Sequence, residues 1–306
     1  MRATKRTPGK VNLCLMVGPR QEGGLHELFT IFVPVSVYDV LDFTLDARPV
    51  AAETSRIVCE CKTSPGEDNL ATRALRTLEQ HTGWALEGRV VIQKGIPVGA
   101  GMGGGSSDAA AALQAGAQAV AEAGGPVLER AQLVAIAREV GADVAFFLDP
   151  RPSVGRGIGE LLEPIELPRF SIVLVFSDRM LATGRVYGTF DVLNPGETQA
   201  VFDFRSGHAE KRWRRAEDVA QAARLLENDL EQASFSLIPA LADHREVLTR
   251  EGALGALMSG SGPTLFGLCG TVEKAEELQR KMVDRGFNAK VAGIIGQKAA
   301  SSSAAW

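Results

Sequence analysis

The first third of the chain alternates short runs of apolar and β-branched residues with turn residues. This pattern is typical of β-strands, in which successive side chains point to opposite faces. It predicts strands over residues 11–17, 29–37, 40–45, 57–61 and 89–93. Lys10 and Asn12 stand two positions apart at the start of the first of these strands, so we expect them to share one face.

Apolar residues at helical spacing follow. Leu70, Ala74, Leu75 and Leu78 predict a helix over 69–82. A second helix is expected to begin just after the glycine run at 103–105 and to extend to about residue 123. A third is predicted over 130–140, with Gly141 as its C-terminal cap.

The second half of the chain mixes both patterns. Residues 155–165 are rich in turn formers, and a strand over 172–176 is expected to open a new unit. Residues 190–215 are polar and carry a basic cluster around Trp213, which predicts a surface excursion. Helices are then expected over 216–235 and 240–251, strands over 256–258 and 264–268, and a helix over 272–285. The Ser/Ala-rich residues 297–306 predict a disordered tail.

These elements follow one another without a regular strand–helix–strand rhythm, which predicts the α+β class and not a doubly wound sheet. The length of 306 residues suggests two domains or one large one. The 33 basic and 37 acidic residues give a net charge of -4, without the basic excess typical of nucleic-acid binders. No apolar run reaches the roughly 18 residues of a membrane span, and no signal peptide is evident. Few cysteines, without metal-ligand spacing, predict free thiols in the cytoplasm.

Residues 96–108 form the most informative segment of the chain. Residues 99–105 include five glycines, which leave no side chains in the way of a ligand and allow positive φ angles. The segment leads into a predicted helix, whose first turn presents unpaired N–H groups and a positive dipole end. Ser106 and Ser107 add hydroxyl groups there. Together these features predict an anion site, most naturally for phosphate, although such a loop can also be a flexible helix entry without a ligand.

Two other phosphate loops fit this segment poorly. A Walker loop requires a lysine that is missing here. Gly99, Gly101 and Gly104 satisfy the dinucleotide pattern Gly-x-Gly-x-x-Gly, but that interpretation also needs an acidic residue after a second strand. Glu122 and Glu129 do not follow an apolar strand. An NAD-binding oxidoreductase therefore stays a minor alternative.

Two further segments complete a pattern. Residues 8–13 carry Lys10 and Asn12, and residues 257–264 form a second glycine/serine turn that contains Gly260, Ser261 and Gly262. In their order and separations, the three segments resemble the GHMP kinase superfamily, and the similarity extends over about residues 4–295. The resemblance implies an α+β two-domain GHMP kinase fold. An N-terminal, ATP-binding domain that is ribosomal-protein-S5-like would span residues 1–160, and a C-terminal ferredoxin-like α/β sandwich would span 161–296.

The resemblance also implies roles for single residues. Asp143 is the expected general base and Lys10 the cation beside it, which would keep Asp143 ionised. From its position alone, Asp143 could also cap a helix. Mg²⁺ would bridge phosphate oxygens of ATP. The expected ATP-binding residues are Asn69, Lys94, Pro97, Gly99, Gly101, Gly103, Gly104, Gly105, Ser106, Ser107 and Asp108.

A narrower resemblance is to the branch of the family that phosphorylates the 2-hydroxyl of a diphosphocytidyl-linked polyol in the non-mevalonate isoprenoid pathway. It rests on residues 24–28, 141–147, 157–160, 183–187 and 228–231 in addition to the three segments. It implies that His26 hydrogen-bonds the cytosine, that Asn12 and Thr183 contact the substrate, and that Tyr187 supplies an aromatic face. The chain departs from the branch at Leu25, where tyrosine is usual, and at Gly23-Gly24, which replaces Asp-Gly.

The resemblance leaves other functions open. A GHMP kinase for homoserine or mevalonate is the main alternative, because Leu25 weakens the cytidine pattern. A non-catalytic sensor with this fold is a second. We expect a small-molecule substrate, no nucleic-acid or membrane partner, and a monomer or weak homodimer in the cytoplasm.

Overall fold

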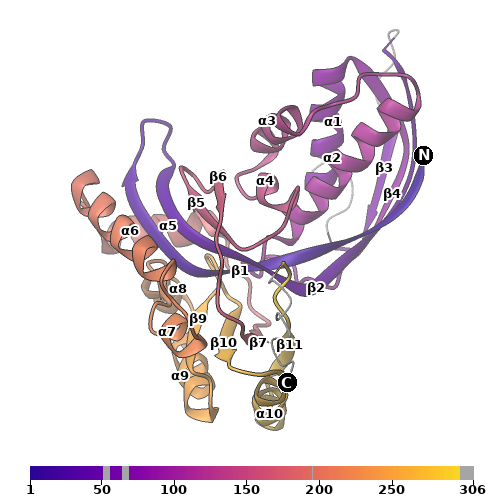
Figure 1. The fold of residues 1–306 in the computed structure, drawn as a ribbon. Coiled ribbons are helices and arrows are strands. Elements are labelled where there is room, and N and C mark those ends of the chain that lie inside the picture. Colours follow the sequence, from indigo (N-terminus) through magenta and orange to yellow (C-terminus); the bar gives the residue numbers. More distant parts are fainter. Residues whose placement is uncertain (51–55, 64–68, 195, 297–306) are drawn as a thin grey trace, which may run out of the picture.

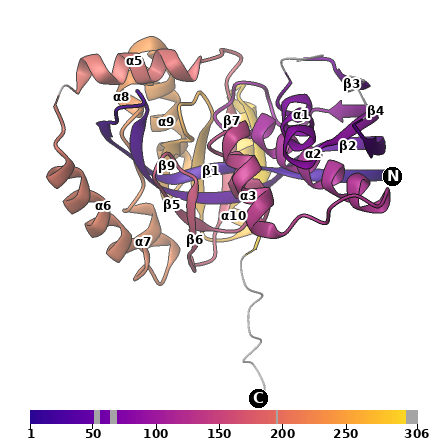
Figure 2. The same ribbon diagram turned by 90° about the horizontal axis from the view of Figure 1, so that it is seen from above.

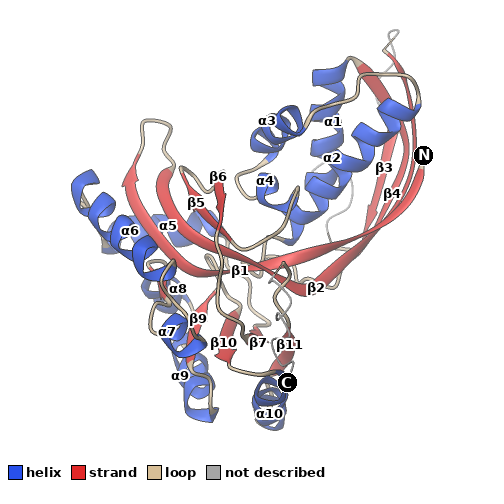
Figure 3. Ribbon diagram, in the orientation of Figure 1, coloured by secondary structure: helices blue, strands red, loops and turns tan. Residues whose placement is uncertain are grey.

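Two β-sheets form the framework of the protein, and helices cover them (Figure 1). The computed structural model describes residues 1–50, 56–63, 69–194 and 196–296, so the predicted tail at 297–306 lies outside the described residues. Strands and helices are mixed along the chain, which confirms the α+β class (Figure 3). Within the described residues, no helix is long and apolar enough to cross a membrane.

The first sheet is built on two long antiparallel strands, β1 and β2. Its strand order is β3-β4-β2-β1-β8, and β5 pairs with β2 and with β6. Its strands are β1 (Arg2–Arg20), β2 (His26–Pro49), β3 (Arg56–Cys61), β4 (Trp84–Gln93), β5 (Ser153–Arg156), β6 (Leu161–Pro164) and β8 (Glu227–Asn228). β8 comes from the second half of the chain but pairs with β1 in the first sheet. Strand pairing therefore does not separate the two domains expected at residues 1–160 and 161–296, and that boundary stays a prediction.

The strands predicted over 29–37 and 40–45 are in fact one strand, β2, which is a correction. The polar residues between them suggest a turn, but Asp39 is fully buried. Its carboxylate accepts hydrogen bonds from the backbone N–H groups of Gly95 and Ile96 at 2.7 and 2.8 Å. Asp39 therefore lies inside one continuous strand, and its buried carboxylate is paired with backbone groups of another segment.

Helices cover one face of this sheet. They are α1 (Leu70–Thr82), α2 (Gly104–Glu122), α3 (Arg130–Val140) and the short α4 (Val144–Phe147). Asn69 caps α1 by accepting from the N–H of Ala71 at 2.9 Å, and Gly141 ends α3 as predicted. α1, α2 and α3 lie where the apolar periodicity predicts them.

The second sheet has the strand order β11-β7-β10-β9, and all of its pairings are antiparallel. Its strands are β7 (Ser171–Phe176), β9 (Gly255–Met258), β10 (Leu265–Cys269) and β11 (Asn288–Ala292). The accompanying helices are α5 (Thr183–Leu193), α6 (Gln199–Trp213), α7 (Val219–Ala223), α8 (Glu231–Leu237), α9 (Ala240–Glu251) and α10 (Val272–Asp284). Seen from above, β1 runs from the α1–α3 group to the α5–α8 group (Figure 2).

Three predictions for the second half need correction in part or in full. Residues 155–165 are not only turns but contain most of a β5–β6 hairpin. Residues 190–215 lie mostly at the surface, as predicted, but they hold the end of α5 and all of α6, and Phe202 and Trp213 are buried. The helix predicted over 216–235 is interrupted by β8, which pairs in parallel with β1. β5 also pairs with β2, α6 packs against β1 and β8 pairs with β1, so partners distant in the sequence help to decide all three segments.

Candidate active site

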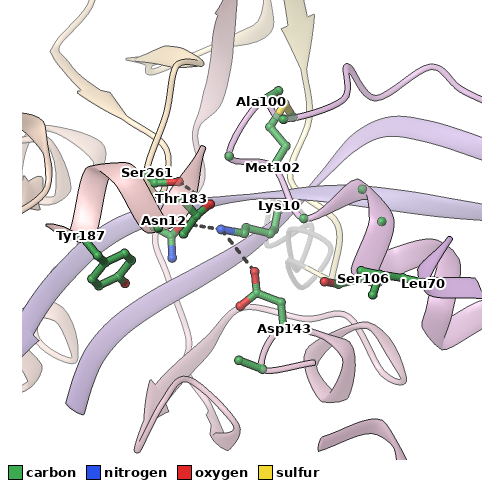
Figure 4. Close-up of a pocket in the computed structure, with 18 of the residues that line it drawn as sticks. Lys10, Asn12, Leu70, Ala100, Met102, Ser106, Asp143, Thr183, Tyr187 and Ser261 are labelled. Atoms are coloured by element: carbon green, nitrogen blue, oxygen red, sulfur yellow. Dashed lines mark hydrogen bonds and ion pairs between the residues drawn. The ribbon is translucent and has the colours of Figure 1, made fainter. Parts of the chain in front are cut away.

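A pocket of about 930 Å³ lies between the α1–α3 group and the α5–α8 group. Figure 4 shows residues that line it. β1 and β2 form its floor, the glycine-rich segment and the first turn of α2 form one wall, and α5 and the loop 259–264 form another. The three sequence segments that carry the family resemblance thus meet around one cavity. Most of the predicted site residues line it: Lys10, Asn12, Leu25, His26, Asn69, Lys94, Pro97, Gly99, Gly101, Gly103, Gly104, Gly105, Ser106, Asp108, Asp143, Thr183, Tyr187, Gly260 and Ser261.

Two predicted site residues do not line the pocket. Ser107 is buried in the first turn of α2, and its hydroxyl oxygen has no hydrogen-bond partner among the described residues. Gly262 lies behind the pocket wall, where a Cβ atom would come within 2.5 Å of Met258 Sδ. Their expected roles in binding a ligand stay predictions.

Lys10 stands at the centre of the pocket floor. Its Nζ lies 3.7 Å from Asp143 Oδ2 and donates to Asn12 Oδ1 at 2.6 Å. Asn12 in turn donates to Thr30 Oγ1 at 2.8 Å, which fixes the side-chain amide with its oxygen toward Lys10. Burial lowers the pKa of Lys10, and the Asp143 carboxylate opposes that shift. Lys10 is therefore a buried, directed cation facing one carboxylate.

Asp143 reaches the pocket from the opposite side. It precedes the buried apolar helix α4, but its side chain makes no capping hydrogen bond. The carboxylate instead points toward Lys10 (Figure 4) and is about one-third exposed. A carboxylate with this access can accept a proton from a bound hydroxyl group.

The glycine-rich segment has the backbone that its composition predicts. Gly99, Gly101 and Gly103 have φ angles of 66°, 72° and 69°, a region that favours glycine. A Cβ on Gly101 would come within 2.3 Å of the carbonyl oxygen of Ser259, so only glycine allows the two loops to approach this closely. The backbone N–H of Lys10 donates to Met102 O at 2.9 Å and joins the segment to β1.

The loop 259–264 is tied to both walls of the pocket. Ser259 Oγ donates to Gly101 O at 3.0 Å. Ser261 Oγ lies 3.0 Å from Thr183 Oγ1, the first residue of α5. Asn228 Nδ2 donates to the carbonyl oxygens of Met258 and Gly260, both at 2.8 Å, and so holds the loop from behind. The loop connects the glycine-rich segment with α5.

A buried charge cluster lies beside the first turn of α2. Lys94 Nζ lies 2.8 Å from Asp108 Oδ2 and also contacts the Asp39 carboxylate. Burial raises the pKa of Asp108 to about 7; Lys94 opposes this shift and Asp39 adds to it. Burial alone would lower the pKa of Lys94, but the two carboxylates outweigh it and the pKa is raised. Lys94 is thus a persistent cation at this end of the pocket, and Asp39 is a contributor that the sequence analysis missed.

The far end of the pocket is built around His26. Its Nδ1 lies 2.8 Å from Gly18 O, and its ring stacks on Tyr187 with centroids 5.7 Å apart and an interplanar angle of 29°. Its Nε2 lies 2.9 Å from Asp191 Oδ1. Leu25 is 57% exposed at the tip of the adjoining turn. Burial and the Asp143 charge raise the pKa of Tyr187, which stays a neutral aromatic surface.

Asp191 and Arg20 also line this end of the pocket and were not predicted from the sequence. A signal for Asp191 was present: it follows Thr183 and Tyr187 at intervals of four residues, the spacing of one helix face. No comparable signal pointed to Arg20, which contacts Asp191 at 3.8 Å only through the packing of β1 against α5.

Comparison with known proteins supplies a second line of evidence. The family model "GHMP kinases N terminal domain" matches residues 69–149, and "GHMP kinases C terminal" matches residues 209–288. A 4-diphosphocytidyl-2-C-methyl-D-erythritol kinase of Anaeromyxobacter dehalogenans (strain 2CP-C) is 39% identical over 274 residues, which cover 88% of this chain and 81% of that protein.

Solved structures agree with these matches. A crystal structure of a 4-(cytidine 5'-diphospho)-2C-methyl-D-erythritol kinase is similar with a TM-score of 0.71 and 33% identity, over 97% of this chain and 100% of the other. A homoserine kinase from Cytophaga hutchinsonii is similar with a TM-score of 0.70 over 97% of this chain and 96% of that one, at 18% identity. The second likeness shows the fold alone.

Proposed function

Because this chain belongs to the GHMP kinase family, we propose that it transfers the γ-phosphoryl group of ATP to the 2-hydroxyl of 4-diphosphocytidyl-2-C-methyl-D-erythritol. This is a step in the non-mevalonate synthesis of isoprenoid precursors. The observation that carries the proposal is the Lys10–Asp143 pair, 3.7 Å apart, on the floor of a pocket that has a glycine-rich wall at one end and a histidine–tyrosine stack at the other.

In the reaction, the oxygen of the substrate hydroxyl forms a bond to the γ-phosphorus of ATP. Asp143 accepts the proton that this hydroxyl loses. The bond between that phosphorus and the bridging oxygen of ADP breaks, and ADP leaves. Catalysis of this kind depends mainly on positioning and on neutralising negative charge. Lys10 supplies a buried positive charge beside the reacting oxygens, and Asn12 fixes the direction of its Nζ.

The ATP phosphates belong at the glycine-rich segment. The first turn of α2 offers backbone N–H groups and the positive end of its dipole, and Gly103, which precedes it, has a positive φ angle. Ser106 adds a hydroxyl at the same place, and Lys94 and Asn69 line the cavity nearby. These features fit a polyanion.

Mg²⁺ is the expected companion of ATP. Among the residues that the structure describes, no cluster of His, Cys, Asp or Glu could hold a metal by itself. Mg²⁺ does not require such a cluster, because it keeps several water molecules and takes most other ligands from phosphates. Ser106 and Asp143, which both line the pocket, would offer it oxygen ligands, and bound Mg²⁺ would neutralise phosphate charge.

The far end of the pocket, around His26 and Tyr187, is called the base end here because a nucleobase would fit it. It favours a cytidine-containing substrate over homoserine or mevalonate. Those smaller acceptors carry no base, and they would leave the region around His26 and Tyr187 without a ligand. A stacked aromatic wall at the end of a cavity suits a planar base. The four cysteines are buried and unbonded, which suits the reducing cytoplasm that we propose as the location.

A coupled assay of ADP release tests the function directly. The purified chain is given ATP and Mg²⁺ together with the diphosphocytidyl substrate, homoserine or mevalonate in separate reactions. We expect turnover with the diphosphocytidyl substrate at a kcat/KM far above that for the other two. Preference for homoserine or mevalonate would show that the protein is a kinase with a different acceptor. No turnover with any acceptor would favour the non-catalytic sensor. Protection against heat by NAD and not by ATP would favour the oxidoreductase.

A further inference from the structure

The His26 side chain is held from several sides by its own hairpin and by α5. The carbonyl oxygen of Gly18 can only accept, so Nδ1 carries the proton of that 2.8 Å hydrogen bond. Tyr187 stacks on one face of the ring, and the Phe190 ring meets it edge-on at 5.9 Å. Nε2 is therefore the ring nitrogen that remains for a ligand.

Asp191 lies against that nitrogen. Its Oδ1 is 2.9 Å from Nε2, yet the buried Nε2 has no aligned hydrogen-bond partner among the described residues and keeps its hydrogen-bonding capacity. The His26 side chain is only 9% exposed, whereas that of Asp191 is 34% exposed and lines the pocket. The partly exposed carboxylate thus stands next to the buried ring nitrogen, and both residues line the same end of the cavity.

Asp191 also reaches the other strand of the same hairpin. Arg20, at the end of β1, approaches Asp191 Oδ2 at 3.8 Å. The Arg20 Nε donates to Gly24 O at 2.8 Å, inside the turn that carries Leu25. One carboxylate on α5 therefore contacts both sides of the turn that forms the end of the pocket.

We propose that Asp191 is a positioning residue for nucleobase recognition. It acts through His26, whose ring it orients, and more weakly through Arg20, which holds the turn at residues 20–26 against α5. The Arg20 contribution is smaller because its side chain is 64% exposed and its charge is screened by solvent. The inference rests on the proposed function, since it assumes a substrate that carries cytosine.

The first test is Asp191→Asn, which keeps the size of the side chain and removes its charge. The KM for the diphosphocytidyl substrate should rise by about tenfold, the scale of a lost interaction with a charged group. The kcat and the KM for ATP should stay within about twofold, because the reacting groups and the glycine-rich segment are untouched. Arg20→Gln should raise the same KM by a smaller factor. Asp284→Asn, which removes an exposed carboxylate at the end of α10, is the matched control and should change nothing.

The second test asks whether Asp191 acts through His26. His26→Ala should itself raise the substrate KM, and adding Asp191→Asn to it should have little further effect, since the group that Asp191 positions is gone. A full tenfold loss in the His26→Ala background would mean that Asp191 contacts the base on its own, and the proposal would be wrong.

Other outcomes also overturn the inference. An unchanged substrate KM in Asp191→Asn would remove Asp191 from recognition. A fall in kcat with a parallel rise in the KM for ATP would indicate general damage to the fold. The wild-type assay separates this inference from the proposed function: a wild-type protein that does not turn over the diphosphocytidyl substrate contradicts the function itself, before any variant is compared.

Discussion

The Lys10 ammonium lies 3.7 Å from the Asp143 carboxylate, although Lys10 belongs to β1 and Asp143 to the start of α4. The glycine-rich segment and α2 lie between them in the sequence, and the backbone of Lys10 bonds to Met102 in that segment. The same connection thus brings the proposed base, the cation beside it and the glycine-rich segment around one point.

Asp143→Asn tests the base. The amide keeps the size of the side chain but is a far poorer proton acceptor, so kcat should fall by about 10²–10⁴-fold. ATP affinity, measured by calorimetry, should change little because the phosphate-binding segment is unaltered. Asp203→Asn on α6 is the control for loss of a carboxylate and should keep full turnover. A kcat within a few-fold of wild type would remove Asp143 from the mechanism.

Gly104→Val tests the phosphate-binding segment. A Cβ at this position would stand 3.0 Å from Ile96 Cγ2 and 3.2 Å from Lys94 Nζ, so the branched side chain must displace Lys94 or narrow the pocket. We expect ATP binding to weaken by at least about tenfold, while circular dichroism stays near that of wild type. Gly207→Val on α6 is the control, because a Cβ there meets none of the described residues within 4 Å. Normal ATP binding by Gly104→Val would mean that the segment is only a structural turn.

Asp108→Asn tests the buried charge cluster through the pH dependence of stability. The pKa of Asp108 is raised to about 7 by burial, against an ordinary value of 3.8. Between about pH 4 and 7 the unfolded chain therefore loses the proton that the folded chain keeps, which destabilises the folded state as pH rises. Each unit of pKa difference corresponds to about 1.4 kcal/mol.

The free energy of unfolding of wild type minus that of Asp108→Asn should accordingly fall as pH rises from about 4 to 7, and should level off above that. Urea unfolding of both proteins at several pH values measures this difference. A difference that does not vary over this range, or that rises with pH, would show that the Asp108 pKa is not raised.

Leu25→Tyr tests the departure from the family pattern at the base end. Leu25 is exposed at the tip of the turn and lines the pocket across from α5, so a tyrosine there would add an aromatic surface to the one that Tyr187 provides. Stacking on one base contributes about 1–3 kcal/mol, and we expect the substrate KM to fall by up to about tenfold. The KM for ATP should not change. Val127→Tyr places the same ring at an exposed position outside the pocket and should have no effect. An unchanged or higher substrate KM in Leu25→Tyr would contradict a stacking role.

The local elements of the first half could be predicted from the sequence because their determinants are local. Apolar residues at helical spacing place α1, and Asn69 caps it through a contact two residues away. Gly141 ends α3 in the same way. The glycine-rich segment, and the shared face of Lys10 and Asn12, likewise depend only on residue type and spacing, so these residues of the pocket could be predicted before its geometry.

Only the tertiary structure decided which distant residues meet. β2 continues through Asp39 because Lys94, Gly95 and Ile96 satisfy the buried carboxylate from another part of the chain. α6 packs inward because Trp213 fills space beneath β1. The basic residues next to Trp213 in the sequence suggest an exposed segment and give no sign of this burial.

The contact between Asp191 and His26 follows the same rule. Periodicity and capping act over a few residues, whereas a buried charge or a ring is stabilised by whatever the fold brings beside it. A single sequence therefore determined the class of this protein and the chemical types at its site. The pairing of α5 with the β1–β2 hairpin, and with it the shape of the base end, arose from packing between segments that no local pattern connects.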